Sequence, residues 1–237
     1  QNIGRLSSGL RINTAADDAA GLAISENLKS QIRSLAQAER NANDGISLLQ
    51  TAEGAMNELS GIMTRMRELA IQSANGTLGT QERSFIQVEF EQLRSEVDRI
   101  ANVTEFNGTL LMDGSFGAMN FQVGLNSGAN YQISVTVNDM NATSLGFGAG
   151  SSVSDLTVTT DVLALASLRV LDEAINDVSA GRAELGAAQN RLQATIANLA
   201  SARENLSAAN SRIRDVDVAD ETAKMTRNNI LMQAGVS

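Results

Sequence analysis

Apolar residues recur every seven positions between residues 161 and 214, and this is the clearest pattern in the chain. The row is apolar throughout: Leu171, Val178, Leu185, Leu192, Leu199, Leu206 and Ile213. A companion row three residues earlier is interrupted by polar residues: Arg182, Gln189, Arg203 and Asn210. This spacing predicts one long helix with a coiled-coil seam. At about 1.5 Å per residue the helix is roughly 80 Å long, so its apolar stripe needs a partner of similar length.

A matching row predicts that partner between Asp17 and Ala74. Its apolar positions follow the same spacing: Leu28, Leu35, Ala42, Leu49, Met56, Met63 and Ala70. The stripe is wider than in residues 161–214, so we expect this helix to contact more than one neighbour. Glycines such as Gly45 favour close helix packing, with a kink near Asn43 as the alternative. Thr14 is expected to cap the start of the helix.

A further helix is predicted from Gln81 to Val103, followed by a small β region. Only a short turn precedes this helix, so it should run antiparallel to the helix before it. Alternating apolar residues predict strands at Asn120 to Val123 and Tyr131 to Val137, joined by a hairpin loop. The segment from Leu156 to Thr160 is interpreted as one more short strand.

These elements predict a mainly α fold with a small β region. We expect an elongated antiparallel helical rod, a coiled-coil-like bundle of three helices, with a short β-hairpin tip. The boundaries we assign are 1–15 for the end of a terminal helix and a linker, 16–106 for the N-terminal arm of the rod, 107–160 for a β-containing outer region, 161–214 for the C-terminal arm, and 215–237 for a linker and the start of a terminal helix.

Composition narrows the classes of function. Histidine and cysteine are absent, which removes the usual general base, the commonest metal ligand and a thiol nucleophile. The sequence therefore offers no candidate catalytic, cofactor-binding or metal-ligating residues, and an enzyme is not expected. A net charge of −9 argues against nucleic-acid binding. No apolar run approaches the ~18 residues that a membrane span needs. A structural or interaction protein fits better.

The sequence of both arms resembles bacterial flagellin. The segments that carry the resemblance are Arg5–Asn13, Ala16–Gly21, Arg40–Ser47, Leu185–Leu192 and Ala209–Asp215. The resemblance implies a structural subunit that self-assembles with other flagellin subunits into the flagellar filament for motility. It also implies secretion through the flagellar export channel with an export chaperone, and polymerisation under a cap protein. The expected location is then the flagellum at the cell surface.

The resemblance also sets expectations for particular parts of the chain. Because Gln1 and Ser237 would fall inside the family's terminal helices, we expect a fragment that lacks most of both helices and stays a soluble monomer. Residues 107–160 would correspond to the family's variable outer region.

A second implied partner is a host Toll-like receptor, which senses many flagellins through the rod. The corresponding motif here is Arg65–Gln72. Arg65, Leu69 and Glu89 occupy the receptor-contact positions. An arginine beside an apolar side chain is a plausible binding hot spot. The alternative is a solvated charged face with Leu69 packing inward.

Two other hypotheses remain open. A protein of the junction between hook and filament would have similar arms. A flagellin-like cell-surface receptor or adhesin would bind a polysaccharide through the tip or the arms.

Overall fold

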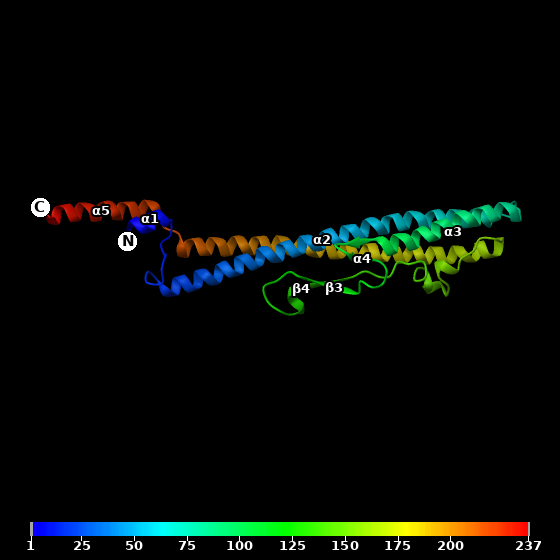
Figure 1. The fold of residues 1–237 in the computed structure, drawn as a ribbon, viewed down its shortest axis with the longest axis horizontal. Coiled ribbons are helices and arrows are strands. Elements are labelled where there is room, and N and C mark those ends of the chain that lie inside the picture. The colour runs from blue at the N-terminus through cyan, green and yellow to red at the C-terminus, as the bar shows by residue number, and fades with distance from the viewer. Residues whose placement is uncertain (1, 237) are drawn as a thin grey trace. The chain divides into compact units, whose positions relative to one another are not determined.

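The computed structural model describes residues 2–236, most of which lie in long helices (Figure 1). The helices are α1 (Asn2–Ser8), α2 (Ala19–Ser73), α3 (Thr80–Val103), α4 (Asp161–Arg214) and α5 (Val218–Val236). The prediction of a mainly α chain with a small β region is confirmed. α4 has the predicted bounds, and α2 begins at Ala19 rather than Asp17. Gln1 and Ser237, which the prediction placed in terminal helices, lie outside the described residues.

The strands form two-stranded antiparallel sheets between α3 and α4 in the sequence. They are β1 (Glu105–Phe106), β2 (Thr109–Leu110), β3 (Ala118–Gln122) and β4 (Gln132–Thr136). β3 pairs with β4 from Ala118 opposite Thr136 to Gln122 opposite Gln132. The β3–β4 hairpin was predicted, but the β1–β2 hairpin around Asn107 was not.

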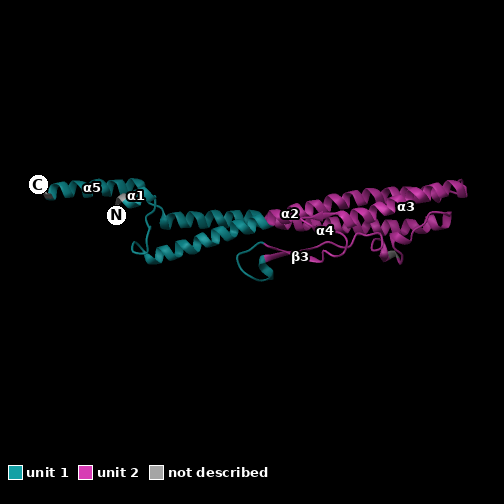
Figure 2. Cartoon of the chain, in the orientation of Figure 1, with its two compact units in different colours: residues 1–41, 123–131, 195–237 teal, residues 42–122, 132–194 magenta. Residues whose placement is uncertain are grey.

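The chain divides into two compact units, which Figure 2 shows in different colours. Unit 1 contains residues 1–41, 123–131 and 195–237, and unit 2 contains residues 42–122 and 132–194. α2 and α4 each contribute one part to each unit, and all of α3 belongs to unit 2.

In unit 2, α3 and α4 both pack antiparallel to α2. Arg65 and Arg67 of α2 pair with Glu89 of α3 and Asp172 of α4. Further along the same helices, Glu53 of α2 accepts a hydrogen bond from Gln189 of α4 at 2.9 Å. The core is aliphatic and rich in methionine, and its fully buried members include Leu49, Met56, Leu59, Met63, Met66, Phe90 and Leu171.

The β3–β4 hairpin packs against α2 at Gly45. A Cβ atom at Gly45 would lie only 3.1–3.2 Å from ring atoms of Phe121, so the hairpin approaches the helix backbone closely. The neighbour of this glycine is thus the ring of a hairpin residue, whereas the prediction was close packing between helices. Gly54 and Gly61 differ, because a Cβ at either position would meet nothing within 4 Å.

In unit 1, α2 and α4 form an antiparallel pair. Leu35 and Ala38 of α2 are buried against Leu199 of α4, and Leu206 packs at the edge of this cluster. The buried Ser25 donates a hydrogen bond to the Asn210 side chain at 2.7 Å. A small apolar cluster and polar contacts thus join the helices here.

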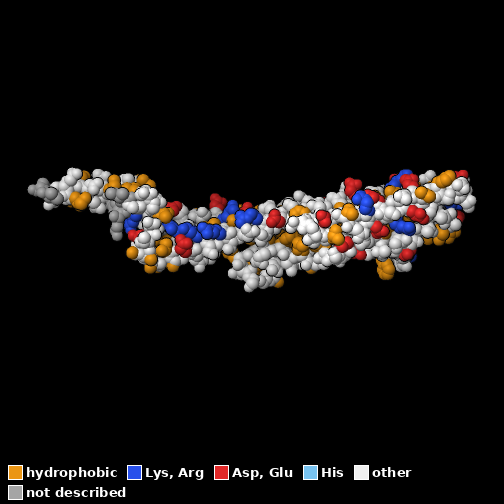
Figure 3. Space-filling view, in the orientation of Figure 1, with side chains coloured by type: hydrophobic (Ala, Val, Ile, Leu, Met, Phe, Trp, Pro, Cys, Tyr) orange, Lys and Arg blue, Asp and Glu red, His pale blue; other side chains and the backbone are white. Residues whose placement is uncertain are grey.

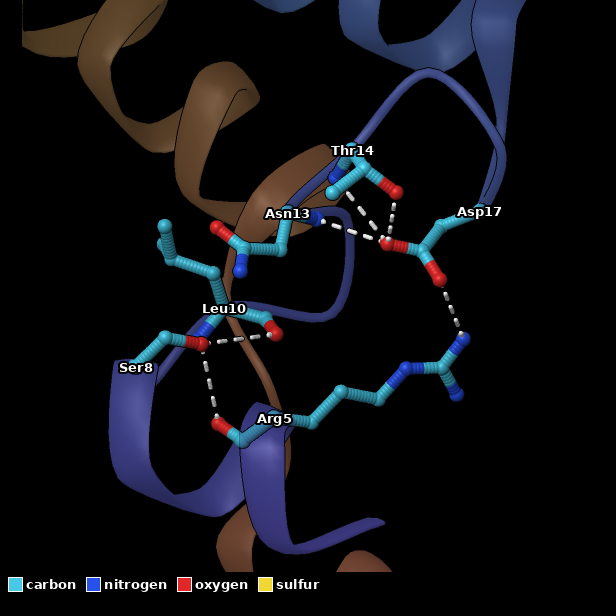
Figure 4. Close-up of polar contacts among 6 residues, drawn as sticks. All are labelled: Arg5, Ser8, Leu10, Asn13, Thr14 and Asp17. Atoms are coloured by element: carbon cyan, nitrogen blue, oxygen red, sulfur yellow. Dashed lines mark hydrogen bonds and ion pairs between the residues drawn. The ribbon is translucent and has the colours of Figure 1, made fainter. Parts of the chain in front are cut away.

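The linker between α1 and α2 is ordered by its own polar groups (Figure 4). One carboxylate oxygen of Asp17 accepts hydrogen bonds from the backbone of Asn13 and Thr14 and from the Thr14 hydroxyl, at 3.0–3.2 Å. The other oxygen lies 3.7 Å from the Arg5 guanidinium. Asp18 accepts from the Gly21 backbone at 2.9 Å and caps α2. The prediction of Thr14 as the cap is therefore wrong, because Thr14 bonds Asp17 instead.

The strand predicted from Leu156 to Thr160 is also wrong. This segment is extended but has no strand partner in the described residues. Side chains of α3 satisfy its backbone instead. Gln87 accepts a hydrogen bond from the Val158 N–H at 2.7 Å, and Arg94 donates to the Leu156 carbonyl at 3.4 Å.

Candidate interaction surfaces

The seven-residue row of α4 lies mostly inside the protein. In unit 2, Leu171, Val178, Leu185 and Leu192 are buried. In unit 1, Leu199 is buried, whereas Leu206 and Ile213 are only partly buried. The seam thus opens toward the end of α4, within the part of the row that belongs to unit 1.

The polar positions of the companion row contact α2 where a partner is observed. Gln189 bonds Glu53, Arg203 pairs with Glu39 at 2.9 Å, and Asn210 accepts from Ser25. Arg182 differs, because its buried Nε atom has no hydrogen-bond partner among the described residues. Gln189, Arg203 and Asn210 fix the alignment of α2 and α4, since each of the three pairs with one particular position on α2.

The proposed receptor-contact residues are brought together only in part. The Arg65 guanidinium donates to Glu89 Oε1 from Nε at 3.0 Å and from Nη2 at 2.8 Å, and Nη1 donates to Glu68 at 3.0 Å. The Arg65 and Glu89 side chains are 49% and 47% exposed. Hydrogen bonds from Arg65 to Glu89, and then to Glu68, raise the pKa of the arginine.

Leu69 is only 1% exposed. Its side chain belongs to the core of unit 2, as in the inward-packing alternative. The expectation that Leu69 itself contacts a receptor does not fit this position, because the heptad-like stripe of α2 takes the side chain inward.

Exposed apolar side chains that the sequence analysis did not single out lie beside the Arg65–Glu89 pair. Phe85 is 66% exposed and Val88 is 58% exposed, on α3. Spacings of three and four residues place Val88 and Glu89 on the same face of α3 as Phe85. The sequence already indicates that these two side chains are exposed, because both fall outside the apolar row of α3 that includes Ile86 and Phe90. Phe85 and Val88 therefore add exposed apolar area to this face of α3.

The rest of the described surface carries both charged and exposed apolar side chains. Basic and acidic side chains are interspersed along the helices on the face that Figure 3 shows. Within residues 2–236, no group of three or more His, Cys, Asp or Glu is placed to hold a metal ion. No helix in the same range is long and apolar enough to cross a membrane. In unit 1, a groove of about 750 Å³ is lined mainly by small and polar residues of α4, with Ile32 of α2.

Comparison with known proteins identifies the fold as that of a known family. The model of the bacterial flagellin N-terminal helical region matches residues 1–117, and that of the C-terminal helical region matches residues 168–237. The chain belongs to the bacterial flagellin family. The flagellin of Bacillus subtilis strain 168 is 49% identical over 264 residues, an alignment that covers 99% of this chain and 86% of that protein.

Solved structures agree with this assignment. The crystal structure of Bacillus cereus flagellin is 31% identical, with a TM-score of 0.58, and covers 72% of this chain and 94% of that one. A putative flagellar hook-associated protein from Vibrio parahaemolyticus has a TM-score of 0.70 over 84% of this chain and all of that one, at 17% identity. The latter similarity concerns the fold alone.

Membership of the flagellin family settles the class of function. The chain is a structural subunit of the bacterial flagellar filament and associates with other flagellin subunits, and it is not an enzyme. As part of the filament it is an extracellular component of the bacterium.

Proposed function

We propose that this flagellin serves motility, and that it is exported through the flagellar secretion channel and polymerises under a cap protein. An export chaperone would keep the chain unpolymerised before export. The observation that carries the proposal is that both flagellin helical regions occur in one chain and pair as antiparallel α2 and α4. Residues 16–106 and 161–214 are then the arms of a filament rod, and residues 107–160 its outer region.

The test is complementation. The full-length protein is expressed in a bacterium from which the flagellin gene has been deleted, and filaments are counted by electron microscopy alongside swimming assays. Long filaments and restored swimming support the proposal. Short caps at the hook without filaments would favour a junction protein. A non-swimming cell whose surface binds a labelled polysaccharide would favour the receptor or adhesin hypothesis, especially if deletion of residues 107–160 abolished binding.

A second proposed role is that of ligand for a host Toll-like receptor. It rests on the exposed Arg65–Glu89 pair, in which an arginine from α2 is fixed by two hydrogen bonds to a glutamate on α3. A pre-oriented guanidinium loses less conformational entropy on binding, which suits a hot spot. Leu69 would act from beneath by holding α2 in place, and Phe85 and Val88 would add apolar contact area.

Receptor-reporter cells test this role. Arg65→Ala and Glu89→Ala should each reduce activity, by about 2 kcal/mol of binding energy if they are hot spots. The matched control is the exposed Arg99–Glu96 pair of α3, with Nη2 to Oε1 at 2.5 Å, whose alanine variants should leave activity unchanged. Equal potency of all variants would eliminate Arg65 and Glu89 as receptor contacts.

A further inference from the structure

Asn-Gly dipeptides occupy exposed turns at two places in unit 2. Asn75–Gly76 lies in the turn that joins α2 to α3, and Asn107–Gly108 joins β1 to β2. We propose that Asn75 is a site of self-catalysed deamidation, promoted by the hydrogen bonds of its turn, whereas the hairpin protects Asn107. The reaction needs only the chain and water.

Deamidation at Asn75 proceeds through a cyclic imide. The backbone nitrogen of Gly76, after losing its proton, forms a bond to Cγ of Asn75. The Cγ–Nδ2 bond breaks, and Nδ2 leaves as ammonia after taking up a proton. The product is a five-membered succinimide in the main chain. Water then opens the ring at either carbonyl, which leaves aspartate or isoaspartate at position 75 and adds one negative charge.

Donors around Asn75 favour formation of the nucleophile. The nucleophile is the deprotonated Asn75–Gly76 amide, whose charge is shared with the Asn75 carbonyl oxygen. That oxygen accepts hydrogen bonds from the Leu78 N–H at 3.2 Å and from Arg83 Nη2 at 3.1 Å. Hydrogen bonds to the charged form of a group favour its ionisation, and a guanidinium does so with a full positive charge.

The electrophile is activated as well. The Thr77 N–H donates to Asn75 Oδ1 at 3.3 Å, which orients the side chain along the backbone. When the Gly76 nitrogen attacks Cγ, negative charge develops on Oδ1, and a donor already aimed at that atom stabilises it.

The hairpin holds Asn107 in a different state. Asn107 and Gly108 both have positive φ, 51° and 76°, as expected for the tight turn that fits a two-residue hairpin. Phe106 pairs with Thr109 directly across the turn, and the Leu111 N–H bonds the Thr104 carbonyl at 3.0 Å. Reorienting the Asn107–Gly108 peptide for ring closure would disrupt this pairing.

Arg83 places a positive charge beside the turn in which the new carboxylate would form. Arg83 also donates from Nε to the Ser73 carbonyl at 2.9 Å, so its guanidinium is fixed beside the turn. A new carboxylate at position 75 would therefore belong to a turn whose backbone already binds a guanidinium.

The experiment incubates the folded full-length protein at neutral pH and follows both sites by peptide mapping with mass spectrometry. The same incubation is repeated in denaturant, where neither turn persists. We expect deamidation at Asn75 to be about tenfold faster than at Asn107 in the folded protein, equivalent to ~1.4 kcal/mol in the barrier. In denaturant the two rates should converge.

Variants identify the groups responsible. Gly76→Ala places a methyl group beside the nucleophile without meeting any neighbour, so it should suppress the reaction at least about tenfold at unchanged helicity. Arg83→Gln should slow it, with Arg99→Gln on the same helix as the matched control. A rate at Asn107 equal to or above that at Asn75 in the folded protein would overturn the proposal, as would a rate ratio that denaturant leaves unchanged.

Discussion

Asp17 shows how one side chain can order a linker. Its carboxylate accepts the Thr14 and Asn13 backbone N–H groups and the Thr14 hydroxyl, and these bonds, in that order, lower its pKa, with a smaller contribution from Arg5. A group whose pKa is lower in the folded state stabilises that state above its unfolded pKa. This stabilisation is lost as the pH falls through the folded pKa.

The first prediction is therefore that acid loosens this linker. The Thr14 amide resonance should shift along a single titration curve with a midpoint below the ordinary Asp value of 3.8. In Asp17→Asn the curve should disappear and the amide should resemble the acid form at all pH values. Asp113→Asn, in a turn of unit 2, is the control. A Thr14 titration that persists in Asp17→Asn would assign the effect to another group.

Leu192 provides a test of the buried seam. It is fully buried in unit 2 and belongs to the seven-residue row of α4. Leu192→Asp would put an unpaired charge in the core, at a cost of at least about 3 kcal/mol. We expect a large fall in the thermal midpoint measured by circular dichroism. Gln193→Asp, one position along on the exposed side, should change the midpoint little. Similar midpoints for both variants would mean that the row is not the stabilising seam.

For individual residues, the sequence predicted which side chains are buried better than it predicted which side chains form an exposed contact surface. Periodicity places Leu171 and Leu192 inside because a helix repeats its faces at fixed spacing. The same periodicity predicts that Leu69 is buried. Its assignment as a receptor contact rested instead on the resemblance to flagellin. Periodicity does not report the exposed Phe85 and Val88, because it identifies apolar residues only where they repeat along a buried face.

The long helices offer a direct comparison of glycines within one element. Gly61 and Gly45 both lie in α2 within unit 2, but only Gly45 has a close neighbour, the Phe121 ring. Gly61→Ala should stabilise the protein by about 0.5–1 kcal/mol, because alanine loses less backbone entropy in a helix.

Gly45→Ala should gain less or destabilise, since its methyl group would press on Phe121 at 3.1 Å. Chemical denaturation of both variants measures the difference. A gain at Gly45 as large as at Gly61 would show that the hairpin yields easily.

The ends of an element could be predicted where its backbone hydrogen bonds are made within the element itself. The bounds of α4 follow from an uninterrupted row within one helix, whose hydrogen bonds are internal. The segment from Leu156 to Thr160 was misassigned because its alternation of apolar residues looks like a strand. Its partners include the Gln87 and Arg94 side chains, which are 71 and 62 positions away from Val158 and Leu156 along the chain, and no local pattern reports such partners.

For the whole molecule, the division into two units was not predictable from the heptads. The seven-residue rows of α2 and α4 continue through both units without a break. The two units differ in which elements cover the paired helices α2 and α4. In unit 2, α3 and the β3–β4 hairpin also pack on α2, and many core residues are fully buried. In unit 1, the α2–α4 pair has a smaller apolar cluster.

This difference predicts that two parts of the same helix are protected from amide hydrogen exchange to different degrees. Amide hydrogen exchange should be slower in residues 42–73 of α2 and 161–194 of α4 than in residues 19–41 and 195–214, because local opening costs less where fewer apolar groups are buried. We expect a gap of at least about tenfold, or ~1.4 kcal/mol. Leu35→Ala should widen it by destabilising only the unit 1 segments, whereas Leu49→Ala should lower protection in unit 2. Uniform exchange along α2 would mean that the units open as one and that the covering by α3 adds no local stability.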